Sequence, residues 1–137
     1  MINKNNLNNV FRCRPMMQNK KGEKKMKSIN EWTKEVHENA KEHGWWENPR
    51  TFGELAMLVT TEVSEAFEEI RNGKLPNETY YNSDNPEKPE GVPSELADVV
   101  IRIMDMCGYY GIDLEEIITK KHEYNKTRPY KHGGKVL

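Results

Sequence analysis

Two pairs of acidic residues constrain the fold of this chain more than any other feature of its sequence. Glu62 and Glu65 are three residues apart in the segment 61–70, and Glu95 and Asp98 repeat that spacing in the segment 94–103. Residues three apart lie on the same face of an α-helix. Each pair is therefore expected to present two carboxylates from one helical face, and the two helices must tolerate four negative charges.

The first pair lies beside the apolar side of its segment. Residues 52–71 carry apolar side chains at helical spacing, and at about 100° per residue Glu62 projects inside the apolar arc. Glu65 projects at the edge of the arc, whereas Glu68 projects on the opposite side. An isolated carboxylate is costly to bury. The pattern therefore predicts that Glu62 faces the interior and that the acidic pairs hold a cation.

Capping and termination signals divide the chain into four predicted helices, over residues 28–43, 52–71, 93–110 and 113–127. The first, second and fourth begin with an N-cap residue followed three positions later by Glu, which is the capping-box spacing. Residues 72–92 contain several prolines and no apolar periodicity. A stretch of this kind predicts a loop, either a lid over a ligand or, as the simpler interpretation, a disordered segment.

These elements predict an all-α, four-helix bundle-like domain over residues 28–137, preceded by a flexible basic extension over residues 1–27. Only 35% of the 137 residues are hydrophobic and 31% are charged, so a modest core is expected. Burial between the subunits of a homodimer or homotetramer would add to it. The net charge of −1 predicts neither a nucleic-acid nor a membrane partner. The two cysteines form no disulfide framework, which fits the cytoplasm.

The acidic pairs predict a magnesium site. Neither pair contains a His or Cys, so the ligands are carboxylate oxygens: Glu62, Glu65, Glu95 and Asp98. Hard oxygen ligands favour Mg²⁺, for which Mn²⁺ can substitute, and disfavour zinc. Protein-bound Mg²⁺ commonly also binds substrate phosphates. This chemistry points to a phosphate-bearing substrate.

The end of the last predicted helix offers a basic face. Lys121, Asn125 and Arg128 follow one another at spacings of four and three residues, so they share a face if the helix continues that far. One interpretation is a phosphate clamp that balances the acidic pairs. The other is an ordinary helix C-terminus, where basic side chains are favourable.

Two adjacent tryptophans, Trp45 and Trp46, lie in the polar connector after the first predicted helix. Large aromatic side chains normally seek burial. The pair is predicted either to close one end of the bundle or to form a stacking wall for a nucleobase. The sequence favours neither interpretation over the other.

Together these residues resemble the MazG-like all-α nucleoside triphosphate pyrophosphohydrolases, in particular the short phage and bacterial MazG-like proteins and the dCTP pyrophosphatases. The resemblance covers residues 28–137. It implies Mg²⁺-dependent hydrolysis of a nucleoside triphosphate substrate to the monophosphate and pyrophosphate, as in nucleotide pool control, by a homo-oligomeric enzyme. It also implies that the four carboxylates bind the metal and that His37 and Trp46 contact the base.

The chain departs from the family at one position. Many members begin the first motif with two adjacent glutamates, and here Thr61 occupies the first position. Either Glu62 or Glu65 is then the residue expected to act as catalytic base with the metal. Two alternatives to the main hypothesis are a phosphoribosyl-ATP pyrophosphohydrolase and a non-catalytic helical interaction module.

Overall fold

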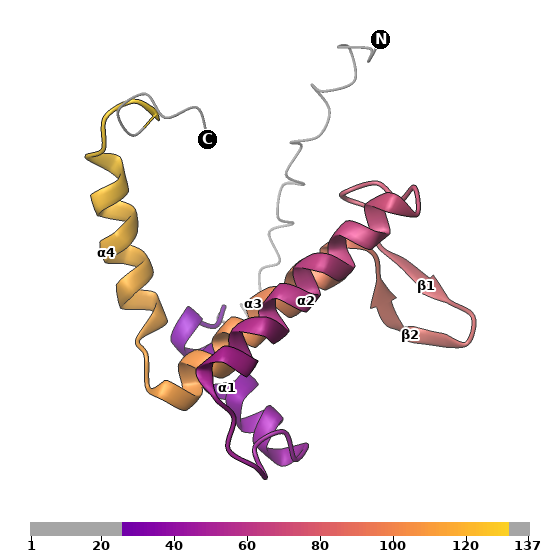
Figure 1. Ribbon diagram of the computed structural model, residues 1–137, viewed down its shortest axis with the longest axis horizontal. Coiled ribbons are helices and arrows are strands. Elements are labelled where there is room, and N and C mark those ends of the chain that lie inside the picture. Colours follow the sequence, from indigo (N-terminus) through magenta and orange to yellow (C-terminus); the bar gives the residue numbers. More distant parts are fainter. Residues whose placement is uncertain (1–25, 132–137) are drawn as a thin grey trace, which may run out of the picture.

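The computed structural model describes residues 26–131, and most of these residues are helical (Figure 1). The elements are α1 (Ile29–Glu42), α2 (Phe52–Arg71), β1 (Tyr80–Asn82), β2 (Asn85–Glu90), α3 (Val92–Tyr110) and α4 (Leu114–Lys126). The mainly α-helical character predicted from the sequence is confirmed. The predicted extension over residues 1–27 lies outside the described residues, apart from its last two positions.

Helix α3 forms the centre of the molecule, because it packs along both α1 and α2. The capping boxes predicted at Ser28 and Thr51 are present and set the starts of α1 and α2. Gly108 allows α1 and α3 to approach closely, since a Cβ atom there would lie 2.5 Å from the Cβ of His37. Cys107, next to it, is buried.

Helix α4 extends away from the other three helices (Figure 1). Its start is attached to α1 by Asn30, whose side chain donates to Asp113 at 2.9 Å and accepts from the backbone N–H of Glu115 at 3.3 Å. No residue of α4 is buried against the described part of the chain. Within one chain, therefore, three of the four predicted helices pack together.

The segment between α2 and α3 is a β-hairpin, so the prediction of a disordered loop was wrong. Strands β1 and β2 pair in antiparallel fashion, with Tyr80 opposite Glu90 and Tyr81 opposite Pro89 (Figure 1). Each strand of a two-stranded sheet is an edge strand, and edge strands accept proline. Most of the hairpin is exposed on both faces. Such a hairpin needs neither apolar alternation nor proline-free strands.

The base of the hairpin is attached to the helices on either side. The hydroxyl of Tyr80 donates to the carboxylate of Glu69 on α2, at 3.2 Å and 3.3 Å to its two oxygens. Gly91 joins β2 to α3 with φ of 102°, and a Cβ atom there would lie 2.4 Å from the backbone oxygen of Glu78. The hairpin therefore has a defined position at the start of α3.

Several apolar side chains of the predicted helical stripes are exposed in the single chain. On α2, Val63 and Phe67 are 50% and 61% exposed, and on α3, Leu96 and Val100 are 49% and 47% exposed. Among the described residues, no helix combines the length and the apolar character that crossing a membrane requires.

Candidate functional site

The two acidic pairs meet where α2 lies against α3. Glu62 from α2 and Glu95 and Asp98 from α3 each offer one carboxylate oxygen, and these three oxygens lie within 4.8 Å of one another. Glu62 is 7% exposed and Glu95 is 8% exposed. The predicted inward position of Glu62 is confirmed, and three of the four predicted carboxylates form one cluster, which we call the acidic cluster.

Glu65 lies at the edge of this cluster. It is exposed on α2, lines the same cleft as the other three acids, and is close enough for its charge to act on Glu95. Its oxygens are not among the three that lie within 4.8 Å of one another. Glu65 is therefore the more accessible of the two acids in the first pair.

Burial and mutual repulsion make the acidic cluster unfavourable when its members are charged. Burial raises the pKa of Glu95, and the charges of Glu65, Asp98 and Glu62 raise it further, against the opposing effect of Lys88. Burial also raises the pKa of Asp98, and the charge of Glu62 adds to this increase. Both directions have the same physical cause, which is the difficulty of keeping negative charges together away from water. A bound cation would relieve it.

Arg102 provides the cluster with a counter-charge that the sequence analysis did not assign. Its Nε donates to a carboxylate oxygen of Glu62 at 3.0 Å, and its guanidinium lies 5.4 Å from the ring centre of Trp45. Arg102 follows Asp98 by four residues on α3, so the two share a helical face. That spacing was the available signal for a cation beside the carboxylates.

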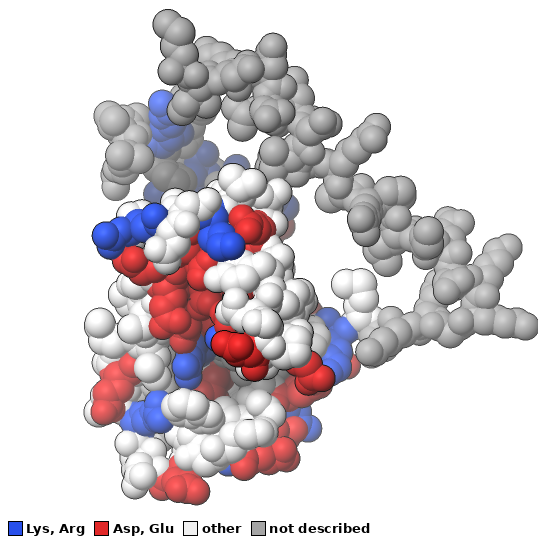
Figure 2. All heavy atoms as spheres, turned by 90° about the vertical axis from the view of Figure 1, so that its right-hand side faces the viewer, with Lys and Arg blue, Asp and Glu red and all other residues white. Residues whose placement is uncertain are grey.

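The acidic cluster lines a cleft of about 530 Å³. Trp32 and Trp45 also line this cleft, together with Asn39 and Asp105. Ligand sites of small molecules commonly span about 300–1,000 Å³, so the cleft is large enough for a nucleotide. On the face of the molecule that carries the hairpin, acidic side chains gather in a central strip with basic side chains near it (Figure 2).

The two residues predicted to contact a base, His37 and Trp46, are not among the described residues that line the cleft. Asp105 accepts from the indole N–H of Trp46 at 2.9 Å and contacts Nδ1 of His37 at 2.7 Å. Trp46 stacks on Tyr109, with ring centres 4.1 Å apart. The two adjacent tryptophans therefore have different surroundings, because Trp46 packs on Tyr109 whereas Trp45 lines the cleft. Base contact by His37 and Trp46 stays a prediction.

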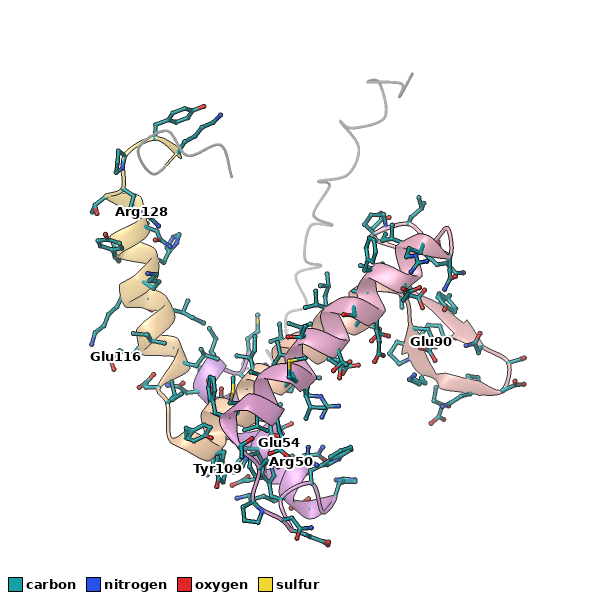
Figure 3. The ribbon with its side chains drawn as sticks, viewed as in Figure 1. Arg50, Glu54, Glu90, Tyr109, Glu116 and Arg128 are labelled. Carbon is teal, nitrogen blue, oxygen red and sulfur yellow. The ribbon has the colours of Figure 1, made fainter. Side chains whose placement is uncertain are left out.

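The predicted phosphate clamp is not at the acidic cluster in the single chain. Lys121 and Asn125 are exposed on α4, and Arg128 follows its end. Arg128 lies at the far end of α4, on the opposite side of the molecule from Glu90 in the hairpin (Figure 3). None of the three is among the described residues that line the cleft. Their phosphate-binding role stays a prediction.

The acidic cluster fits a hard divalent cation. Its donors are all carboxylate oxygens, and two of the three side chains are buried. Mg²⁺ binds oxygens at about 2.1 Å, so ligands on opposite sides of one ion are about 4.2 Å apart. Oxygens already within 4.8 Å need only small side-chain movements to share an ion.

Such a cation would lie beside a cleft that Trp32 and Trp45 also line. Comparison of the chain with protein-family models, with curated proteins and with solved structures gave no match.

Proposed function

We propose that this protein is a Mg²⁺-dependent pyrophosphohydrolase that converts a nucleoside or deoxynucleoside triphosphate to the monophosphate and pyrophosphate. The observation that carries the proposal is the acidic cluster of Glu62, Glu95 and Asp98 in the lining of a nucleotide-sized cleft. The resemblance of the doubled acidic motif to the MazG-like enzymes supports the same function.

The carboxylates have different roles in this proposal. Glu62, Glu95 and Asp98 would hold the ion, and bound Mg²⁺ or Mn²⁺ supplies charge neutralisation of the phosphates and a bound water of lowered pKa. Glu62 is buried and already contacts Arg102, whereas Glu65 is exposed to the cleft. This difference supports Glu65 as the base that accepts a proton from the attacking water, with Glu62 as a ligand.

Trp45, on the wall of the same cleft, supports a site for the nucleobase. Trp45 is half-exposed there and presents an aromatic ring, on which any base can stack. Asp105 connects this region to His37 and Trp46 through the two contacts described above. In this proposal His37 and Trp46 support the wall of the base site.

We also propose that the protein is a homodimer or homotetramer. The exposed apolar side chains on α2, α3 and α4 would be covered by further copies of the chain. On α4 they include Ile117, Ile118 and Tyr124. If Lys121, Asn125 and Arg128 bind phosphate, they must do so either after a movement of α4 or at the cleft of a neighbouring copy.

The test is pyrophosphate release by the full chain from a panel of canonical and modified nucleoside triphosphates, with phosphoribosyl-ATP included. The wild type should release pyrophosphate with Mg²⁺ and stop in EDTA. Glu62→Gln should reduce the rate of pyrophosphate release about a hundredfold or more. Loss of a residue that only orients a metal ligand costs up to about a hundredfold, and loss of a ligand should cost at least as much. Glu68→Gln is the matched control, because Glu68 lies on α2 but pairs with Arg71 at the surface.

Each alternative has a distinct outcome. Activity confined to phosphoribosyl-ATP would identify the related hydrolase instead. A folded Glu62→Gln variant with unchanged pyrophosphate release would refute the metal-site assignment. A wild type that neither binds Mg²⁺ nor releases pyrophosphate would leave the helical interaction module as the explanation.

A further inference from the structure

The β-hairpin brings a cation to the acidic cluster. Lys88 on β2 lines the same cleft as the four acids of the two pairs. The position is defined by the fold, because β2 pairs with β1 and leads through Gly91 directly into α3. Among the described residues lining the cleft, the cations are Lys88 and Arg102.

Lys88 is charged and accessible. Its Nζ lies 3.0 Å and 3.1 Å from the two carboxylate oxygens of Glu90, and its side chain is 57% exposed. The hydrogen bond to Glu90 raises the pKa of Lys88, and the charges of Glu90, Glu95 and Asp98 raise it further. The ammonium therefore lies within the electrostatic field of the acidic cluster without being tied to one of its members.

The second cation of the cleft is less available for a ligand. Arg102 donates to Glu62 and lies against the ring of Trp45. A metal-bound triphosphate keeps negative oxygens that the ion does not neutralise, and these need donors from the protein. A mobile ammonium on an exposed stem can follow such oxygens, because its three donors rotate freely.

We propose that Lys88 binds the outer phosphates of the substrate from the hairpin side of the cleft, a role that rests on the proposed function. Glu90 pairs with the ammonium until the phosphates replace it. Lys88 then acts as a positioning group for the triphosphate and does not bind the metal.

The test compares Lys88→Ala with Lys74→Ala in the full-length protein. Lys74 is a matched control, because it also pairs with a glutamate of this region, Glu78 at 3.2 Å, but does not line the cleft. The probe is inorganic triphosphate with Mg²⁺, measured by calorimetry. Lys88→Ala should bind inorganic triphosphate about tenfold more weakly than the wild type, because it loses one charge-assisted hydrogen bond. Lys88→Arg should restore part of the affinity, and Lys74→Ala should match the wild type.

A purely structural role of the Lys88–Glu90 ion pair predicts a different pattern. If Lys88 only holds the hairpin in place, Glu90→Gln breaks the same ion pair and should weaken triphosphate binding as much as Lys88→Ala. If Lys88 binds phosphate, Glu90→Gln keeps the ammonium and should leave affinity for triphosphate unchanged or higher. Mg²⁺ binding without triphosphate should not weaken in Lys88→Ala.

Two results would overturn the proposal: equal affinities of Lys88→Ala and Lys74→Ala, or equal losses in Lys88→Ala and Glu90→Gln. Failure of the proposed function is seen elsewhere, in a folded wild type that releases no pyrophosphate from any nucleotide. The binding of inorganic triphosphate tests Lys88 in either case.

Discussion

Replacing Glu95 with glutamine should make the metal-free protein more stable. Glu95 is 8% exposed, and its oxygen lies within 4.8 Å of those of Glu62 and Asp98. Glutamine has nearly the same shape but carries no charge, so it removes both the desolvation of a carboxylate and its repulsion by the neighbours. The perturbation therefore isolates the electrostatic part of the acidic cluster.

The size of the effect follows from the distances. Two unit charges 4.8 Å apart repel by about 3.5 kcal/mol at an effective dielectric constant of about 20. Two effects reduce the stability that Glu95→Gln gains from removing this repulsion. Lys88 attracts Glu95, and an acid in the first turn of a helix contributes about 0.3–1 kcal/mol through the helix dipole. We expect a net stabilisation of about 1–2 kcal/mol, which raises the melting temperature by about 5–10 °C in a domain of this size.

The assay is thermal unfolding of the full chain near neutral pH, in EDTA and in millimolar Mg²⁺. Glu95→Gln should melt above the wild type in EDTA, and the wild type should gain more from Mg²⁺ because it keeps all its ligands. Glu68→Gln is the control, since an exposed ion pair contributes about 0–1 kcal/mol. A Glu95→Gln variant that melts at or below the wild type in EDTA would show that the cluster is not electrostatically strained.

Two further predictions follow from the same structure. The pKa of Glu95 is raised in the folded protein, so folding favours its protonated form. This contribution to stability is fully present below the ordinary pKa of 4.5 and is lost as the pH rises through the raised pKa. The melting difference in EDTA between Glu95→Gln and the wild type should therefore widen upward from about pH 4.5; a constant difference would contradict this. Gly108→Ala should destabilise the protein by about 1–3 kcal/mol in urea unfolding, because its Cβ would meet His37 at 2.5 Å. Gly53→Ala should not destabilise the protein, since its Cβ would lie 3.9 Å from Thr51, which is an ordinary contact distance.

The features that depend on one helix at a time could be predicted from the sequence. The ends of the helices follow from local capping chemistry, as at Ser28 and Thr51. The inward position of Glu62 follows from its angle relative to apolar neighbours on the same helix. The meeting of Glu62 with Glu95 and Asp98 needed one further step, namely that the apolar sides of two helices pack together.

Features that depend on exposed pairing or on the relative placement of helices were out of reach. The hairpin is held by backbone pairing and by the contact of Tyr80 with Glu69, which leave no periodic apolar pattern. The faces of α4 could be read from the sequence, but its direction relative to α1–α3 could not. Asp105 is a similar case, because its partners His37 and Trp46 come from distant parts of the chain.

The negative charge of the cleft gives a reason to expect the basic side chains of α4 near the acidic cluster. Six carboxylates and two cations line the cleft among the described residues. A triphosphate is itself strongly anionic, so one divalent ion cannot balance both the acids and the ligand. The remaining positive charge must come from a second ion or from basic side chains that reach the cleft. In the proposed homo-oligomer, the apolar side chains exposed on α2, α3 and α4 also need cover. An assembly that covers them and brings Lys121 and Arg128 of one copy to the cleft of another would meet both requirements with one set of contacts.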